Sequence, residues 1–180
     1  GRAVDTLNRF FDAVVVHSDS NLIKLEETFS LHAKIGIPIF YTGYIAKKPP
    51  ANARRQIRSR LKIMDKDPMI VASAGGGSVG KHLLESTIYA FKKFGRDSSA
   101  SLMVYTGPYI AEKDFAYLKS FANQRIKVEK FTSDFLAFMA AADLSISMGG
   151  YNTSMDILAC GVPALVWPFG HNREQRLRAQ

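Results

Sequence analysis

The sequence predicts an α/β protein with a doubly wound, mostly parallel, Rossmann-like sheet and helices on both faces. Short apolar runs alternate with segments of helical periodicity, and this repeated order is typical of parallel sheets. Most runs are continuously apolar, as expected of strands that are buried on both faces. Glycines follow some of the runs, at the strand ends where open α/β sheets bind ligands. The expected strands are residues 12–17, 37–42, 69–74, 101–106, 126–131, 144–148 and 164–167.

Length and composition allow one sizeable domain, or one domain with a piece of another. Of the 180 residues, 47% are hydrophobic, and no run approaches the roughly 20 apolar residues of a membrane span. The single cysteine, Cys160, excludes an internal disulfide framework, and its apolar helix position predicts a small buried side chain. Because the chain opens on Gly-Arg and stops inside an expected helix, we expect it to be an internal part of a longer polypeptide.

Residues 1–45 predict a βαβ piece of their own. Residues 12–17 are expected to form a short buried parallel strand, and a helix should run from an N-cap at residues 18–20 to about Phe29. The next strand, residues 37–42, follows Gly36. This piece has no obvious glycine-rich phosphate loop.

The chain is basic, with a formal net charge of +8 and a pI near 9.6. Such a balance favours anionic partners, among them nucleotide phosphates, a lipid headgroup surface and nucleic acid. A solvated basic surface is the simpler interpretation. The charge is concentrated in residues 46–62, after Pro49 and Pro50, and its cationic helix positions are Arg54, Arg55, Arg58, Arg60 and Lys62.

The segment 46–62 predicts a helix, since Ile57 and Leu61 are spaced i, i+4. We expect this helix to lie solvated on the surface of the domain. Peripheral membrane contact through residues 47–62 is the alternative, because acidic lipid attracts clusters of this kind. The segment has no interleaved aromatic residues, so we do not expect nucleic acid to bind it.

The next βα unit contains a glycine-rich turn. The strand at residues 69–74 runs into Gly-Gly-Gly-Ser-Val-Gly, and a helix follows from about residue 81 to 94, with Leu84, Ile88 and Phe91 on one face. Such a turn can bring backbone close to a phosphate, although by itself it is a weak signal. It lacks the Lys-Ser/Thr ending of a P-loop.

Two further βα units complete the middle of the chain. The strand at residues 101–106 is followed by a helix from about 111 to 122, and the strand at 126–131 by a helix at 133–142. Polar and apolar residues alternate in the second of these strands. This pattern predicts one solvent-facing side and a position near an edge of the sheet.

The last stretch has the order strand, glycine pair, helix, strand and polar loop. Asn152 and Thr153 stand at the start of the helix 152–160, where they could cap it or lie close to a phosphate. Asp156 shares a face with Asn152 by the i, i+4 rule. Its carboxylate could accept hydrogen bonds from two vicinal hydroxyls, or could compensate the helix dipole.

The order of these residues resembles the nucleotide-sugar signature of GT-B glycosyltransferases. It is similar both to the plant-type natural-product enzymes and to the lipid-linked N-acetylglucosaminyltransferases of peptidoglycan synthesis, the MurG family. The plant-type signature has a His-Cys-Gly-Trp-Asn-Ser run, then a Glu, Gly-Val-Pro, Trp-Pro and an acidic-Gln pair. The corresponding residues here are Gly150-Tyr151-Asn152-Thr153, Asp156, Gly161-Val162-Pro163, Trp167-Pro168 and Glu174-Gln175. Gly76, Gly77 and Ser78 match the Gly-Gly-Ser-x-Gly turn of the MurG family.

The resemblance implies a GT-B carboxy-terminal domain at residues 46–180, truncated at its carboxy end. Residues 1–45 would then be the end of the amino-terminal acceptor domain and the linker strand. The implied function is a hexosyltransferase that binds a UDP-sugar, for example UDP-GlcNAc, and transfers the sugar to an unidentified acceptor. Such enzymes need no bound metal or other cofactor, and the expected location is cytoplasmic, at the membrane periphery if residues 47–62 bind lipid.

The resemblance also implies a role for each matching residue. The diphosphate would lie at Gly76, Gly77, Ser78, Gly150, Asn152 and Thr153. The ribose hydroxyls would lie at Asp156, the donor sugar at Glu174 and Gln175, and the uracil at Phe131 and Thr132. A plain core position is the alternative for Phe131. Two residues depart from the plant-type signature, since Met148 replaces a phosphate-binding His and Asp156 replaces a longer Glu.

No catalytic base can be assigned, and in this superfamily it usually lies in the amino-terminal domain. The histidines are scattered at positions 17, 32, 82 and 171, and His171 is a candidate for orienting the sugar. We therefore expect this piece to be inactive alone. Two other functions are compatible with the sequence: a GT-B-fold UDP-sugar 2-epimerase, and a non-catalytic donor-binding subunit of a two-chain glycosyltransferase.

Overall fold

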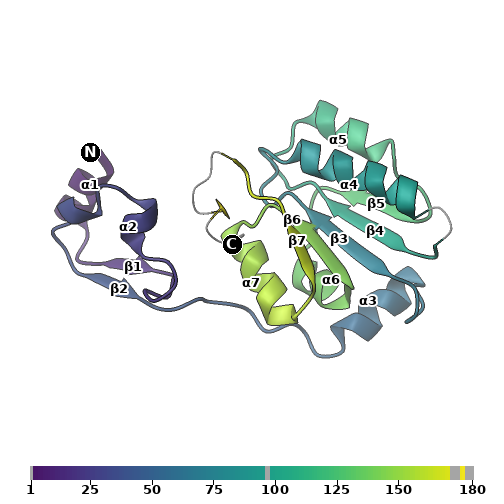
Figure 1. Ribbon diagram of the computed structural model, residues 1–180, viewed down its shortest axis with the longest axis horizontal. Helices are drawn as coiled ribbons and strands as arrows, with labels where there is room; N and C mark the ends of the chain where they lie inside the picture. The colour runs from purple at the N-terminus through teal and green to yellow at the C-terminus, as the bar shows by residue number, and fades with distance from the viewer. Residues whose placement is uncertain (1, 96–97, 171–174, 177–180) are drawn as a thin grey trace. The chain divides into compact units, whose positions relative to one another are not determined.

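The computed structural model describes residues 2–95, 98–170 and 175–176. By its internal contacts the chain forms two compact units, Gly1–Ala46 and Lys47–Gln180 (Figure 1). The boundary lies one residue beyond the one expected from the sequence. That the first unit is the end of an acceptor domain stays a prediction.

The first unit contains a two-stranded parallel sheet, which confirms the predicted βαβ order. Two details of the prediction are wrong. Val15 is 55% exposed, so the first strand is not buried here. The helix expected from residue 18 is reduced to its last turn, because the Asp19 carbonyl and carboxylate accept hydrogen bonds from the next residues and form a turn instead. The elements are α1 (Arg2–Phe10), β1 (Val14–Val16), α2 (Leu25–Thr28), the 3-10 helix η1 (His32–Lys34) and β2 (Ile39–Tyr41).

The second unit is built on a five-stranded, fully parallel sheet with the strand order β5-β4-β3-β6-β7. This arrangement confirms the doubly wound fold predicted from the alternation of strands and helices. Most strands end one or two residues earlier than expected. The strands are β3 (Met69–Ser73), β4 (Ser101–Tyr105), β5 (Ile126–Glu129), β6 (Leu144–Ser147) and β7 (Ala164–Val166).

Helices cover both faces of this sheet. Figure 1 shows α4 and α5 on one side and α3, α6 and α7 on the other. Alternate residues of β3 pack against the helices on opposite faces of the sheet. Ala72 packs with Leu84 and Ile88 of α4, whereas Val71 packs with Met139 of α6. The helices are α3 (Ala53–Leu61), α4 (Lys81–Phe94), α5 (Glu112–Lys119), α6 (Phe135–Ala141) and α7 (Tyr151–Cys160).

The chain changes direction across the sheet at β3. From β3 it proceeds outward through β4 to β5, and then crosses back to β6 on the other side of β3. Open α/β sheets bind ligands at such a switch point, beyond the carboxyl ends of the strands. β5 is an edge strand, and Lys127 and Glu129 are exposed, as the alternating sequence predicted.

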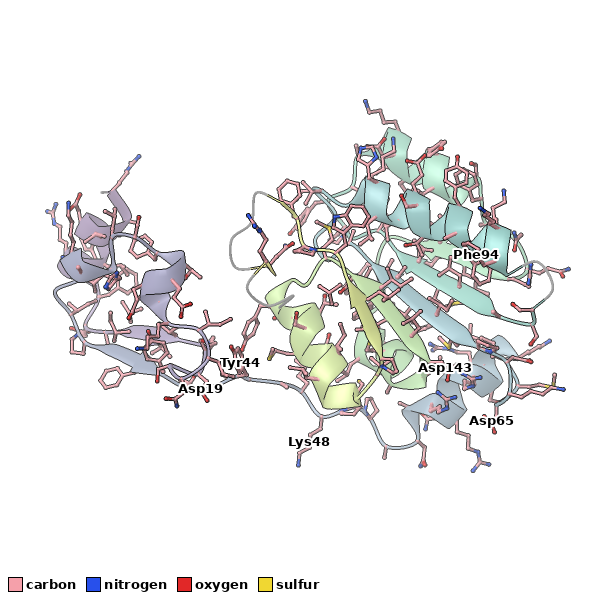
Figure 2. The ribbon with its side chains drawn as sticks, viewed as in Figure 1. Asp19, Tyr44, Lys48, Asp65, Phe94 and Asp143 are labelled. Atoms are coloured by element: carbon pink, nitrogen blue, oxygen red, sulfur yellow. The ribbon has the colours of Figure 1, made fainter. Side chains whose placement is uncertain are left out.

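Helix α3 is not simply solvated, which corrects the expectation for the basic segment. The Arg58 side chain is only 2% exposed, and its guanidinium donates to the carbonyls of Met64 and Asp67 and pairs with Asp143 at 3.2 Å. Arg54 pairs with the same carboxylate at 2.8 Å. Asp143, labelled in Figure 2, therefore joins this helix to the sheet at the start of β6.

Candidate functional site

Two turns of the same form leave the sheet at its switch point. β3 ends in Ser-Ala-Gly-Gly and β6 ends in Ser-Met-Gly-Gly. The Ser73 hydroxyl accepts a hydrogen bond from Gly75 N at 3.1 Å, and the Ser147 hydroxyl accepts one from Gly149 N at 3.4 Å. Gly75 and Gly149 have φ angles of 64° and 72°. Glycine is the residue that adopts this left-handed conformation without strain, so the glycines direct the chain away from the strands.

The first turn is interlocked with the loop after β4. A Cβ on Gly77 would overlap the carbonyl oxygen of Thr106, and one on Gly107 would overlap the carbonyl oxygen of Gly75. Both glycines also have positive φ angles, of 89° and 86°. Their lack of a side chain is therefore what allows the two backbone segments to pack against each other.

The two turns also meet each other. A Cβ on Gly80, at the end of the first turn, would lie 2.5 Å from the Met148 sulfur in the second. Met148 is 7% exposed and belongs to the core under α4. This position, where the plant-type signature has a histidine, is thus filled by an apolar side chain that holds the turns together.

Helix α7 begins directly after the second turn. Gly150 is its N-cap, and no side chain caps it. The interpretation of Asn152 and Thr153 as caps is therefore wrong, because both already lie inside the first turn of the helix. The first turn of a helix leaves backbone N–H groups without intrahelical acceptors and carries the positive end of the dipole. This end is suited to an anionic group.

A pocket of about 180 Å³ lies at this end of the sheet. Loops from three neighbouring strands contribute to it, together with the starts of α6 and α7. It is lined by Ser73, Gly75, Tyr105, Gly107, Pro108, Lys130, Phe131, Thr132, Phe135, Asn152, Thr153 and Asp156.

Five of the residues proposed from the sequence line this pocket together. They are Phe131, Thr132, Asn152, Thr153 and Asp156. Phe131 is 71% exposed, so its interpretation as a plain core residue is wrong. The Thr132 hydroxyl accepts a hydrogen bond from Asp134 N at 3.1 Å, and the Thr153 side chain is buried.

Other proposed residues do not line the pocket. Gly76, Gly77 and Ser78 belong to the first turn and Gly150 to the second. Of these four, Gly76 is next in the chain to a lining residue, Gly75.

Gln175 lies beside the second turn. Its side-chain oxygen accepts from Phe169 N at 2.9 Å, and a Cβ on Gly149 would lie 3.7 Å from its backbone oxygen. Glu174 and His171 lie outside the described residues.

Asp156 is the acidic side chain among the described lining residues. It lies in the second turn of α7, beyond the first turn where a charge interacts best with the dipole, which argues against dipole compensation. Burial raises the pKa of Asp156 above its ordinary value, and the positive charge of Lys47 partly opposes this shift. The carboxylate is half-buried and opens into the pocket, where it can accept hydrogen bonds from a ligand.

Sequence reasoning missed several lining residues, chiefly Ser73, Tyr105 and Lys130. Each stands at or directly after the carboxyl end of a strand, and this position was the available signal. Tyr105 packs edge-on against the rings of Phe135 and Phe138, with ring centroids 5.5 and 5.4 Å apart. Burial raises the pKa of Tyr105, so its hydroxyl stays protonated and can donate a hydrogen bond.

The described residues supply no candidate metal centre: no group of three or more His, Cys, Asp or Glu side chains comes together among them. Nor does any helix in the described part of the chain have the length and apolar character to cross a membrane. In the basic segment, Arg54 and Arg58 are paired with Asp143, and Arg60 with Asp134. Three of its cationic side chains are thus engaged within the unit.

The pocket therefore combines groups of different chemistry. It has an exposed aromatic ring in Phe131, a carboxylate in Asp156, and the positive end of α7 beside Asn152 and Thr153. Such a set suits a ligand that has a flat ring, hydroxyl groups and an anionic group.

Comparison with known families gives one match over most of this unit. The family described as "Glycosyltransferase family 28 C-terminal domain" matches residues 72–180. A curated protein of Blochmanniella pennsylvanica (strain BPEN), the UDP-N-acetylglucosamine--N-acetylmuramyl-(pentapeptide) pyrophosphoryl-undecaprenol N-acetylglucosamine transferase, is 31% identical over 106 residues. The match covers 56% of this chain and 28% of that protein, so the chain spans less than a third of its relative.

Solved structures share the fold. The crystal structure of MurG from Acinetobacter baumannii has a TM-score of 0.55 and 21% identity, and the match covers 99% of this chain and 59% of that one. Phytolacca americana UGT2, complexed with UDP-2fluoro-glucose and pterostilbene, has a TM-score of 0.55 and 14% identity, with 94% of this chain and 36% of that one covered. At these identities the likeness concerns the fold.

Proposed function

Because this chain belongs to the family of glycosyltransferase family 28 C-terminal domains, we propose that it is the donor-binding part of a glycosyltransferase and binds a UDP-sugar at the carboxyl edge of its sheet. UDP-GlcNAc is the donor that we propose first. The single observation that carries the proposal is the pocket in which Phe131, Asn152, Thr153 and Asp156 meet.

Each part of a nucleoside diphosphate sugar has a suitable group in this region. The N–H groups in the first turn of α7 and the Thr153 hydroxyl can donate to the diphosphate. The Asp156 carboxylate can accept from the two ribose hydroxyls, and the exposed Phe131 ring offers a face to the base. Gln175, beside the second turn, is proposed at the donor sugar, with Glu174.

The same groups would assist sugar transfer. When the bond between the sugar and the diphosphate breaks, negative charge grows on the leaving phosphate. Oriented N–H groups at a helix end stabilise such charge without having to reorganise. The acceptor hydroxyl would lose its proton to a base outside the described pocket, because Asp156 is the carboxylate that lines it and we assign it to the ribose.

The whole reaction is proposed for a longer assembly. The curated relative is several times longer than the stretch matched here, since the match covers 28% of it. We therefore propose that the acceptor and the catalytic base are held by another part of the protein. A cytoplasmic location with peripheral membrane contact is also a proposal, and the exposed Lys48, Arg55 and Lys62 are the candidates for that contact.

Calorimetric titration of UDP and UDP-GlcNAc into the 180-residue chain tests donor binding. We expect saturable binding, with Asn152→Ala and Asp156→Asn each weakening it. Leu158→Ala is a matched control, because Leu158 lies on the same helix, is 71% exposed and does not line the pocket. An absence of saturable heat at millimolar UDP would overturn the proposal.

A further inference from the structure

Arg60 does not line the pocket, yet two sets of contacts connect it with the pocket wall. It lies on α3, outside the loops that form the pocket. Its guanidinium pairs with Asp134 and also stacks over the ring of Phe138. Both partners lie at or within α6, the helix that follows the Phe131–Thr132 loop.

The first connection passes through the loop backbone. Arg60 Nη1 lies 3.0 Å from Asp134 Oδ2, and the Asp134 N–H donates to the Thr132 hydroxyl at 3.1 Å. At the other end of the loop, Lys130 pairs with Glu112 and its ammonium lies 4.9 Å from the centre of the Phe115 ring. Phe131 and Thr132 are therefore held between two ion-paired residues, one anchored to α3 and one to α5.

The second connection passes through aromatic rings. The Arg60 guanidinium carbon lies 5.1 Å from the centre of the Phe138 ring, and Phe138 packs edge-on against Tyr105 at 5.4 Å. Tyr105 in turn packs edge-on against Phe135 at 5.5 Å, and both of these residues line the pocket. Arg60 thus supports the wall behind the loop as well as the loop itself.

We propose that Arg60 is a positioning residue, which sets the Phe131–Thr132 loop and the aromatic wall beside it for the base of the nucleotide. This inference rests on the proposed function, because it assumes that the pocket holds a nucleoside diphosphate. It predicts that Arg60 acts on the affinity for the base and ribose, and leaves the binding of phosphate groups at α7 unchanged.

The expected effect is moderate, because the ion pair is half exposed: the side chains of Arg60 and Asp134 are 51% and 49% accessible. Exposed pairs are partly screened by water and salt, so losing this one should weaken UDP binding by roughly twofold to fivefold. Arg60→Lys keeps the charge but loses the planar stacking on Phe138, and should have an intermediate effect.

The loop can be observed without any ligand. In ¹H–¹⁵N spectra of the free chain, Arg60→Ala should shift the amides of Phe131, Thr132 and Asp134 and speed up their hydrogen exchange. Arg55→Ala is the matched control, since Arg55 is exposed on the same helix and makes no ion pair within the described part of the chain. Unchanged Phe131 and Thr132 amides in Arg60→Ala would overturn the inference.

Binding then separates positioning from a general loss of structure. Affinities for UDP and for inorganic pyrophosphate are measured side by side on the wild type, Arg60→Ala, Asp134→Asn and the double variant. We expect Arg60→Ala to weaken UDP binding and leave pyrophosphate binding unchanged, and the double variant to lose no more affinity than Arg60→Ala alone. A general destabilisation would weaken both ligands, and equal losses for both would overturn the inference.

The outcomes also separate this inference from the proposed function. If the wild-type chain does not bind UDP, the proposed function fails and this inference fails with it. If the wild type binds UDP and Arg60→Ala binds it equally well, this inference fails alone and the donor site stands.

Discussion

Ser73 and Ser147 are register partners across β3 and β6, and each hydroxyl accepts a hydrogen bond from the glycine N–H two residues later. The two strands therefore end at the same level of the sheet and leave it through turns of the same form. The order of the sheet reverses between these strands, and the pocket lies at this switch point, beyond their carboxyl ends. The position of the site is thus a consequence of where two short turns begin.

The interlocked glycines give a direct test of this geometry. Gly77→Ala should destabilise the fold by roughly 2–4 kcal/mol, since it forces a positive φ on alanine and drives a Cβ into the Thr106 carbonyl. Gly76→Ala, one residue earlier, should cost less than about 1 kcal/mol, because its Cβ would make only ordinary contact with Tyr109 at 3.6 Å. Urea unfolding measures the free energy of unfolding of both variants. Equal losses in Gly77→Ala and Gly76→Ala would contradict the interlocked arrangement.

Asp156→Asn should weaken ligand binding and raise stability at neutral pH. Burial raises the pKa of Asp156 above its ordinary 3.8, so the folded state holds the proton to a higher pH than the unfolded state does. The protonated Asp156 therefore stabilises the folded state, and this stabilisation is fully present below pH 3.8. It is lost as the pH rises through the raised pKa of the folded state. The asparagine variant avoids that loss.

Thermal unfolding at several pH values checks the stability of the Asp156 variant. At pH 7, Asp156→Asn should unfold at a higher temperature than the wild type, and the difference should shrink as the pH falls toward 3.8. Loss of one hydrogen-bonding carboxylate should weaken UDP binding roughly 10- to 100-fold. A variant that is less stable at pH 7 would mean that the buried carboxylate has a partner that stabilises its charge.

Asp143→Ala should cost about 3 kcal/mol, because it leaves the buried Arg58 guanidinium without its carboxylate. Burial alone would raise the pKa of Asp143, but the Met69 N–H, Arg54 and Arg58 outweigh it and hold the pKa below 3.8. The ionised Asp143 therefore stabilises the folded state at every pH above 3.8. This stabilisation is lost as the pH falls through the lowered pKa of Asp143 in the folded state.

Urea unfolding from neutral to acid pH measures this effect. The wild type should lose stability in acid, and Asp143→Ala should show a flatter dependence. Asp65→Ala is the control: Asp65 lies 3.8 Å from Arg58 Nε but its side chain is 96% exposed (Figure 2). We expect Asp65→Ala to leave the free energy of unfolding unchanged. A loss as large as that of Asp143→Ala would contradict the assignment of this stabilisation to Asp143.

Cys160 should alkylate slowly in the folded protein. Burial, together with the negative charge of Asp156, raises the pKa of its thiol to about 11, and the sulfur contacts the Leu136 carbonyl at 3.7 Å. The residue is half-buried, where the sequence predicted full burial. Because only the thiolate reacts, iodoacetamide at pH 8 should modify it at least about tenfold more slowly than in urea. Equal rates in the two solutions would show that the thiol is open to solvent.

Local patterns predicted much of the fold correctly. The helical spacing of Leu84, Ile88 and Phe91 placed all three in the core, and the i, i+4 spacing of Asn152 and Asp156 placed both in one pocket. In each case the period of a single element settles which side chains share a face.

The errors have a different physical origin. Arg58 was expected in solvent, but it is buried because it meets Asp143, a residue 85 positions away. Phe131 has an apolar side chain, yet it is exposed because its loop is held between partners on α3 and α5. Contacts between residues far apart in the chain cannot be predicted from the spacing of residues within one element.

The sequence by itself determined the order of strands and helices, the two glycine turns and the orientation of the side chains on α7. These features follow from periodicity and backbone preferences that act within a few residues. Only the tertiary structure decided that the loops after β3, β4 and β5 would meet α7 in one pocket, and that Arg60 would lie behind it. Strand register and the direction of each crossover bring these segments together, and both depend on packing between residues far apart in the chain.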